Sequence, residues 1–222
     1  MDAAGDRSNK KLKAAREELI KQIGREISDE RVLHAMAKVP REAFVPEQIR
    51  DLAYEDRPLP IGDGQTISQP FIVALMTQAL ELVGTERVLE LGAGSGYQAA
   101  ILAELAREVI TVERVPVLAE RAKRTLEELG YTNVQVHLAE ETLGWRAGAP
   151  YDAIIVTAAA PRVPQELLSQ LVVNGLMVIP VGSLWDQDLL QVRKQEEGLA
   201  ITHLTPCRFV PLIGEEAWSE EE

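Results

Sequence analysis

Cysteine, long apolar runs and an excess of basic charge are missing from this sequence. Cys207 is the only cysteine among 222 residues, which excludes an intrachain disulfide framework and a cysteine zinc cluster. No apolar run approaches the roughly 20 residues that a membrane-spanning helix needs, so no membrane association is expected. Residues 1–15 lack the apolar core of a signal peptide. Together these absences predict a cytoplasmic protein.

The charge balance is acidic. Lys and Arg total 23, and Asp and Glu total 35, which gives a formal net charge of −12. Binding to nucleic-acid phosphates depends on a basic patch, so no nucleic-acid partner is expected. The three histidines, His34, His137 and His203, have no metal-ligand spacing, and no metal site is predicted. We expect the chain to act as a monomer.

Short apolar runs alternate with helical stretches from residue 87 onward. This alternation predicts an α/β fold with a doubly wound, mainly parallel sheet. A polar turn at 196–198, between two apolar runs, predicts antiparallel strands at the C-terminal end of the chain. The expected strands are 87–91, 109–112, 134–138, 153–156 and 176–181, and the expected helices are 97–106, 116–129 and 164–172.

The first third of the chain has a different pattern. Residues 1–10 are polar and are expected to fray. Residues 11–38 are predicted to be helical with an interruption near Gly24, and another helix is expected at 69–82. Prolines and glycines between 58 and 65 exclude a helix there.

The length of the chain suits one domain, 1–222. Within it we expect a helical N-terminal region (1–80), an α/β core (81–212) and an acidic tail (213–222). The N-terminal region is interpreted as a cap on the sheet rather than as a separate unit.

A glycine-rich loop is the strongest single motif. It follows an apolar strand and opens a helix, a context in which glycines let a ligand approach backbone N–H groups. A dinucleotide fingerprint would place a third glycine at Tyr97. Glu90, just before the loop, is a poor neighbour for pyrophosphate and a good one for a cation. S-adenosylmethionine carries a sulfonium and an ammonium group, so charge complementarity favours it over NAD. The predicted contacts are Glu90, Gly92, Ala93, Gly94, Ser95 and Gly96.

A second carboxylate, Glu113, closes the next strand. At that position it can accept hydrogen bonds from both hydroxyls of an adenosine ribose. A simpler interpretation is that the loop is only a tight turn and that Glu113 is a solvated strand end. The presence of Glu90 and Glu113 together favours cofactor binding.

Several blocks resemble one known family between about Val39 and Trp218. They are Val39–Pro46, Ala53–Asp56 with Leu59–Gly62, the distinctive Gly64-Gln65-Thr66-Ile67-Ser68-Gln69-Pro70, Ala149–Ile154 and Arg208–Leu212. With the glycine loop, they make the chain similar to the protein-L-isoaspartate (D-aspartate) O-methyltransferase family. The resemblance implies the Rossmann-like fold of S-adenosylmethionine-dependent methyltransferases, with the active-site loop in residues 1–80 and the cofactor on residues 81–212.

The resemblance also implies a reaction and a substrate. The family methylates the free α-carboxylate of L-isoaspartyl and D-aspartyl residues in damaged proteins and peptides, which are the implied partners. The ester then cyclises to a succinimide, whose hydrolysis returns some normal aspartate. Ser68 would be the active-site hydroxyl, although by position alone it reads as a helix cap before Pro70. The implied substrate-binding residues are Thr66, Ile67, Val210, Pro211 and Leu212.

One segment departs from the family. Where the family has Gly-Asp-Gly beside the adenine, this chain has Ala139-Glu140-Glu141. Glu140 keeps a carboxylate, and Glu141 replaces a glycine, so a positive φ would be costly there. We expect Glu140 and Glu141 to contact the cofactor, with either a tolerated change or weaker adenine binding as the result.

Three alternatives to the first interpretation remain. One is a methyltransferase of the same fold that acts on another substrate. Another is a non-catalytic paralogue that retains the fold as a binding module, which only the change at 139–141 supports. The third is an NAD dehydrogenase, which Tyr97 and Glu90 oppose.

Overall fold

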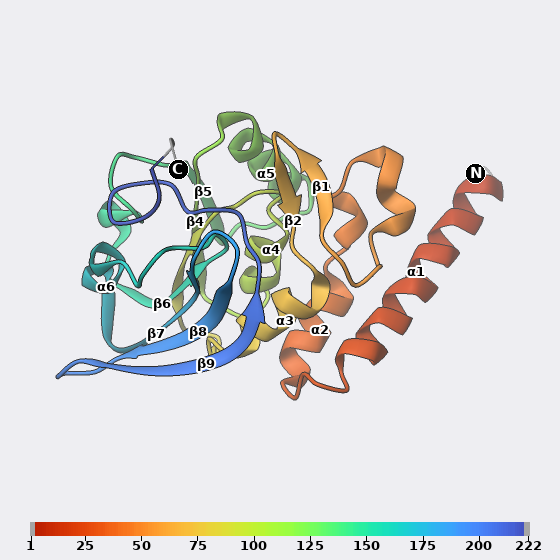
Figure 1. The fold of residues 1–222 in the computed structure, drawn as a ribbon. Coiled ribbons are helices and arrows are strands. Elements are labelled where there is room, and N and C mark those ends of the chain that lie inside the picture. Colours follow the sequence, from red (N-terminus) through yellow and green to blue (C-terminus); the bar gives the residue numbers. More distant parts are fainter. Residues whose placement is uncertain (1–2, 220–222) are drawn as a thin grey trace.

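The computed structural model describes residues 3–219 and shows a central sheet covered by helices (Figure 1). The strand order is β5-β4-β3-β6-β7-β8-β9. The pairs from β5 to β7 are parallel, and β7–β8 and β8–β9 are antiparallel. This arrangement confirms the predicted α/β class, including the antiparallel strands at the C-terminal end.

The strands of this sheet are β3 (Arg87–Leu91), β4 (Glu108–Glu113), β5 (Val134–Leu138), β6 (Tyr151–Val156), β7 (Leu171–Gly182), β8 (Gln187–Lys194) and β9 (Leu199–Cys207). Strands β3, β4 and β6 are almost wholly buried because the sheet is covered on both faces, which explains their continuous apolar runs.

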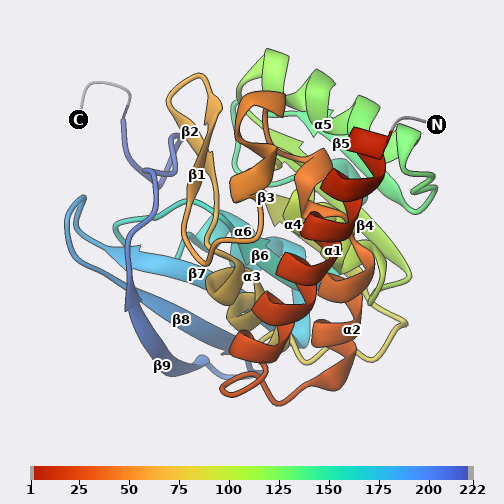
Figure 2. The same cartoon turned by 90° about the vertical axis from the view of Figure 1, so that its right-hand side faces the viewer.

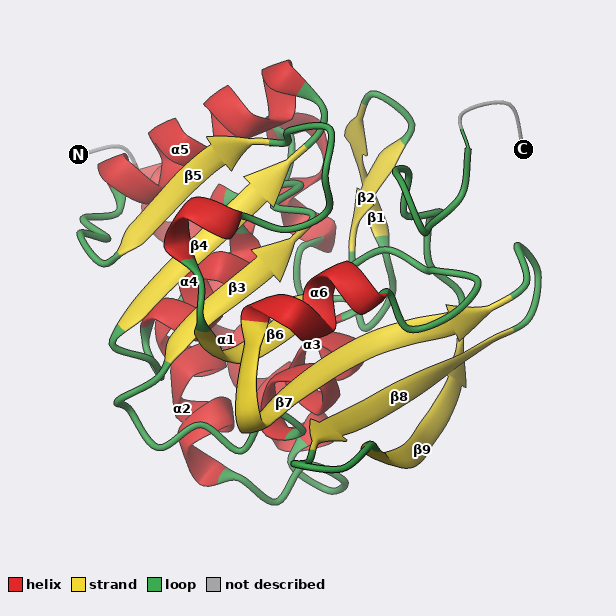
Figure 3. Ribbon diagram, turned by 90° about the vertical axis from the view of Figure 1, so that its left-hand side faces the viewer, coloured by secondary structure: helices red, strands yellow, loops and turns green. Residues whose placement is uncertain are grey.

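Helices cover the two faces unequally. The α-helices are α1 (Ala3–Ile23), α2 (Glu30–Lys38), α3 (Pro70–Gln78), α4 (Tyr97–Ala103), α5 (Pro116–Glu128) and α6 (Gln165–Gln170). Figure 3 shows α6 on the near face of the sheet and the other five behind it, and Figure 2 shows α1 and α2 as the outermost layer of that second face. Among the described residues, no helix is both long and apolar enough to cross a membrane.

The helical prediction was right in outline and wrong at four places. Residues 3–10 belong to α1 instead of fraying, α3 ends at Gln78 instead of at 82, α4 ends at Ala103 instead of at 106, and residues 171–172 begin β7 instead of ending a helix. Of the expected acidic tail, residues 213–219 are described, whereas 220–222 lie outside the described part of the chain.

A small hairpin was not predicted. The segment that excludes a helix forms β1 (Leu59–Gly62) and β2 (Gln65–Ile67), an antiparallel pair outside the main sheet. Its turn has positive φ at Gly62, Asp63 and Gly64, and Arg121 of α5 donates a hydrogen bond to the Ile61 carbonyl at 2.6 Å. The hairpin is thereby fixed beside the core.

One hydrophobic cluster joins the N-terminal region to the sheet. It runs from Leu19 and Ile23 of α1, through the β1–β2 hairpin, to Val88 of β3 and Ile155 of β6. This shared packing agrees with a cap on the sheet. The division of the chain at residues 80 and 212 stays a prediction.

Candidate active site

A cavity of about 210 Å³ lies at the carboxyl ends of the parallel strands β3, β4 and β6. In open α/β sheets this edge is where ligands bind. The cavity is lined by the loop after β3, the end of β4, the loops after β5 and β6, and two pieces from outside the parallel strands, 65–68 and 210–213. The site is thus assembled from the core and from both flanking regions.

The glycine loop lies tightly against the end of β6. Gly92 has a φ of 96°, and a Cβ at this residue would lie 2.3 Å from Oγ1 of Thr157. That hydroxyl donates to the Leu91 carbonyl at 2.9 Å and to the Gly92 carbonyl at 2.7 Å. Glycine is therefore required at this position by both backbone conformation and space. Gly92, Ala93, Gly94 and Ser95 line the cavity, whereas Gly96 packs against Ala122 of α5.

Glu113 anchors the loop from the end of β4. Its two carboxylate oxygens accept hydrogen bonds from the backbone N–H of Gly94 and of Val115, each at 2.8 Å. The side chain is 7% exposed and lines the cavity. Each oxygen has a second lone pair, so hydroxyl groups of a ligand could be bound without breaking these contacts.

Glu90 does not form part of the cavity wall. It is fully buried on β3, and neither of its oxygens has a hydrogen-bond partner among the described residues. Burial raises the pKa of Glu90 to about 8; the neighbouring Thr111 hydroxyl opposes this rise and the charge of Glu113 adds to it. Direct contact between Glu90 and a cofactor stays a prediction.

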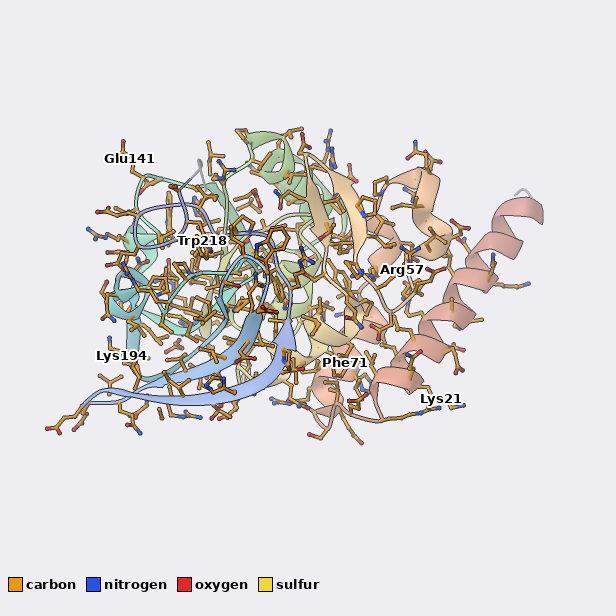
Figure 4. All side chains as sticks on the ribbon, viewed as in Figure 1. Lys21, Arg57, Phe71, Glu141, Lys194 and Trp218 are labelled. Atoms are coloured by element: carbon orange, nitrogen blue, oxygen red, sulfur yellow. The ribbon has the colours of Figure 1, made fainter. Side chains whose placement is uncertain are left out.

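The loop after β5 forms another wall of the cavity. Residues 139–144 all line it, including Glu140 and Glu141. The backbone at Glu141 does not adopt a positive φ, so the strain expected from the lost glycine does not arise. Its side chain is exposed, and Figure 4 shows it at the edge of the molecule. The backbone of the loop therefore accommodates Glu141 without strain, and the effect of this change on adenine binding stays a prediction.

Gln170, at the end of α6, holds the same loop and was not identified from the sequence. It is 2% exposed, its Nε2 donates to the Leu143 carbonyl at 2.8 Å, and its Oε1 accepts from the Trp145 N–H at 2.9 Å. A glutamine on a short helix gives no pattern in the sequence, because its partners are distant in the chain.

Ser68 faces this cavity from the segment before α3. Gln65, Thr66, Ile67 and Ser68 all line it. The helix begins after Gln69, and no hydrogen bond of the Ser68 side chain is present within the described residues. The hydroxyl is thus not used as a helix cap, and it remains available to a ligand.

The segment Val210–Leu212 forms the opposite wall. Ala159 donates its N–H to the Val210 carbonyl and accepts from the Leu212 N–H, both at 2.8 Å. Just before it, the backbone of Phe209 is held by the buried Gln187, whose Oε1 accepts from the Phe209 N–H at 2.7 Å. Gln187 is a second positioning residue that sequence reasoning missed.

Among the described residues, no group of three or more His, Cys, Asp or Glu side chains is arranged to hold a metal ion. His137 stacks on Trp145 with ring centroids 4.0 Å apart. Burial lowers the pKa of His137, against an opposing effect of Glu140.

The residues that are present fit a nucleoside cofactor without phosphate. The cavity offers a backbone turn that only glycine can form at Gly92, and an acceptor-only carboxylate at Glu113. It also offers the acidic side chain of Glu140. These acceptor groups bind the hydroxyl and amino groups of a ligand better than they bind pyrophosphate, which is itself negatively charged.

Comparisons with known proteins agree with this site. The family model described as "Protein-L-isoaspartate(D-aspartate) O-methyltransferase (PCMT)" matches residues 14–217. A protein-L-isoaspartate O-methyltransferase from Geobacter metallireducens is 55% identical over 201 residues, which cover 90% of this chain and 93% of the relative. One from Pelobacter propionicus is 57% identical over 198 residues, which cover 88% of each chain.

Solved structures give the same result. A protein-L-isoaspartate O-methyltransferase structure superposes with a TM-score of 0.81 and 30% identity, covering 91% of this chain and 67% of that one. A Plasmodium falciparum structure, described as a β-aspartate methyltransferase in complex with S-adenosyl-L-homocysteine, superposes with a TM-score of 0.75 over 88% of this chain and 96% of that one. It is 24% identical, so it supports the fold alone. The resemblance found in the sequence is confirmed, and the chain belongs to the protein-L-isoaspartate (D-aspartate) O-methyltransferase family.

Proposed function

We propose that this chain transfers a methyl group from S-adenosylmethionine to the free α-carboxylate of L-isoaspartyl and D-aspartyl residues in damaged proteins and peptides. The observation that carries the proposal is the shared cavity. It brings the glycine loop after β3 together with Ser68 and with Val210–Leu212, which lie far apart in sequence. A cofactor loop and two substrate-binding segments thereby meet at one place.

The reacting group explains why the site needs no strong base. A carboxylate with an ordinary pKa near 3.5–4 is already ionised at neutral pH. S-adenosylmethionine supplies the electrophilic methyl group on a sulfonium. The remaining task of the protein is to align the carboxylate with that group and to exclude water.

Each segment then has a defined role. Ser68 donates a hydrogen bond that orients one carboxylate oxygen. Glu113 accepts from ribose hydroxyls while it holds the glycine loop. Since backbone groups alternate in direction along an extended segment, the Pro211 carbonyl points away from Ala159, where it can accept from the main chain of a peptide. Thr66 and Ile67 contact the substrate on the other side of Ser68.

Two further aspects belong to the same proposal. We place the protein in the cytoplasm, where the single Cys207 would stay reduced. We also propose that it acts as a monomer, since the residues assigned to cofactor and substrate can be supplied by a single chain.

The direct test is methyl transfer from labelled S-adenosylmethionine to an isoaspartyl peptide, with the matching aspartyl peptide as control. We expect only the isoaspartyl peptide to be labelled. Equal labelling of both would contradict the specificity. Cofactor binding without transfer to either peptide would favour another substrate.

Ser68→Ala tests the proposed orientation of the carboxylate. Loss of one donor to a charged group in a preorganised site lowers turnover by about 10²–10³-fold. The dissociation constant of S-adenosylmethionine, measured by calorimetry, should change little, because the glycine loop is untouched. Wild-type turnover in this variant would remove Ser68 from the reaction.

A further inference from the structure

The backbone around Ser68 is held from two sides by side chains of the N-terminal region. Arg41 donates from Nη2 to the Ser68 carbonyl at 2.8 Å. Asp56 accepts from the Phe71 N–H at 2.9 Å and from Nε2 of Gln69 at 3.1 Å. The three hydrogen bonds therefore fix the segment 68–71 at Ser68, at Gln69 and at Phe71.

Asp56 caps the N-terminus of α3 from outside the helix. Helix α3 begins with Pro70, which has no N–H, and the side chain of Gln69 makes no capping bond. The N–H of Phe71 is then the first donor of the helix that needs an acceptor, and Asp56 supplies it. Because this need is met by a residue outside the helix, the Ser68 hydroxyl is not consumed by the backbone.

Arg41 connects the same segment to the rest of the site. Its side chain is fully buried, and Nε donates to the Ala53 carbonyl at 2.8 Å. The guanidinium lies 4.8 Å from the ring centroid of Tyr97, which is the first residue of α4 and lines the cavity. One rigid cation thus links the Ser68 backbone to the helix that follows the glycine loop.

We propose that Arg41 and Asp56 are positioning residues that fix the Ser68 hydroxyl for the substrate carboxylate. The inference rests on the proposed role of Ser68 and extends it to two residues that do not line the cavity. Neither side chain touches the reacting atoms. They keep the Ser68 hydroxyl in the position that an in-line transfer requires. A displacement of about 1 Å can lower the rate on the order of 100-fold.

The test compares two variants that each remove a capping carboxylate. Asp56→Ala frees the segment 68–71, whereas Asp29→Ala removes the cap of α2, where Asp29 accepts from the Arg31 N–H away from the cavity. We expect Asp56→Ala to lower kcat on an isoaspartyl peptide by about 10- to 100-fold, and Asp29→Ala to leave kcat nearly unchanged. The calorimetric dissociation constant of S-adenosylmethionine should stay within about twofold in both, because neither carboxylate contacts the glycine loop.

A conservative variant guards against a general loss of structure. Asp56→Asn keeps an oxygen for the Phe71 N–H but loses the charge, and we expect it to recover most of the kcat that Asp56→Ala loses. Arg41→Lys cannot bridge the Ala53 and Ser68 carbonyls with a fork of donors. It should therefore lower kcat at temperatures well below unfolding, together with a lower melting temperature, because one buried carbonyl loses its donor.

The double variant Ser68→Ala/Asp56→Ala decides whether Asp56 acts through Ser68. If it does, kcat of the double variant should lie within about twofold of Ser68→Ala alone, because interacting residues are not additive. Fully multiplied losses would overturn the proposal, as would equal kcat for Asp56→Ala and Asp29→Ala. A fully active Ser68→Ala variant would also overturn the proposal. The proposed function would still stand in that case, provided that the unmodified chain methylates the isoaspartyl peptide.

Discussion

The buried carboxyl group of Glu90 makes a specific prediction about stability and pH. Its pKa is raised from an ordinary value of 4.5 to about 8 in the folded protein. Between these two values the folded state keeps a proton that the unfolded state has released. The free energy of unfolding must therefore fall as the pH rises through this window. Replacing Glu90 by Gln keeps the shape of the side chain and removes the titration.

The size of the effect follows from the shift. The difference between 4.5 and about 8 corresponds to about 5 kcal/mol over the whole window, at about 1.4 kcal/mol for each pH unit. Between pH 5 and pH 8, most of this range is crossed. We therefore expect the stability of Glu90→Gln, relative to the unmodified protein, to increase by about 4 kcal/mol from pH 5 to pH 8.

The assay is urea unfolding at pH 5, 6, 7 and 8 in the absence of cofactor, with the free energy obtained by linear extrapolation. Glu17→Gln is a suitable control, because Glu17 is exposed on α1. Its free energy of unfolding is measured at the same four pH values for comparison. A Glu90→Gln difference that stays constant from pH 5 to pH 8 would show that the Glu90 carboxyl is ionised in the folded protein, and the reasoning would fail.

Three further predictions concern the cavity walls and are measured as dissociation constants of S-adenosylmethionine by calorimetry. Gly92→Ala should weaken binding by more than about tenfold, because strain of about 1–2 kcal/mol adds to the clash with Thr157; Gly84→Ala, also at positive φ but in open space, should not. Gln170→Ala should weaken binding by about tenfold, since a buried carbonyl and N–H lose their partner. Glu141→Gly should change it by less than about threefold, because the side chain is exposed and its backbone is unstrained; a larger change would show that this residue tunes the cofactor site.

Local patterns in the sequence were enough to predict the central sheet. Strands such as β3 and β6 are buried on both faces, so they appear as continuous apolar runs between helical segments. The β1–β2 hairpin could not be recognised in the same way. Its strands are very short, and its stability depends on contacts such as that of Arg121 with Ile61, which join residues far apart in the chain.

The candidate site was predictable to the extent that its residues belong to local motifs. The glycine loop, Glu113 and Ser68 were found because each lies in a recognisable block. The orientation of Glu90 was not, because a strand residue two positions before a loop can face either side of the sheet. The capping of α3 by Asp56 could not be predicted either. The sequence around Pro70 contains Ser68, a residue of the type preferred for a cap, much closer to the start of the helix.

The cavity is closed by residues 65–68 on one side and 210–213 on the other. A peptide substrate that touches both segments would join parts of the chain that are far apart in sequence. Binding stabilises the folded protein by an amount that grows with ligand concentration over its dissociation constant. The supply of damaged peptides would therefore also raise the free energy of unfolding of the enzyme, so that the protein is most stable when it has substrate to repair.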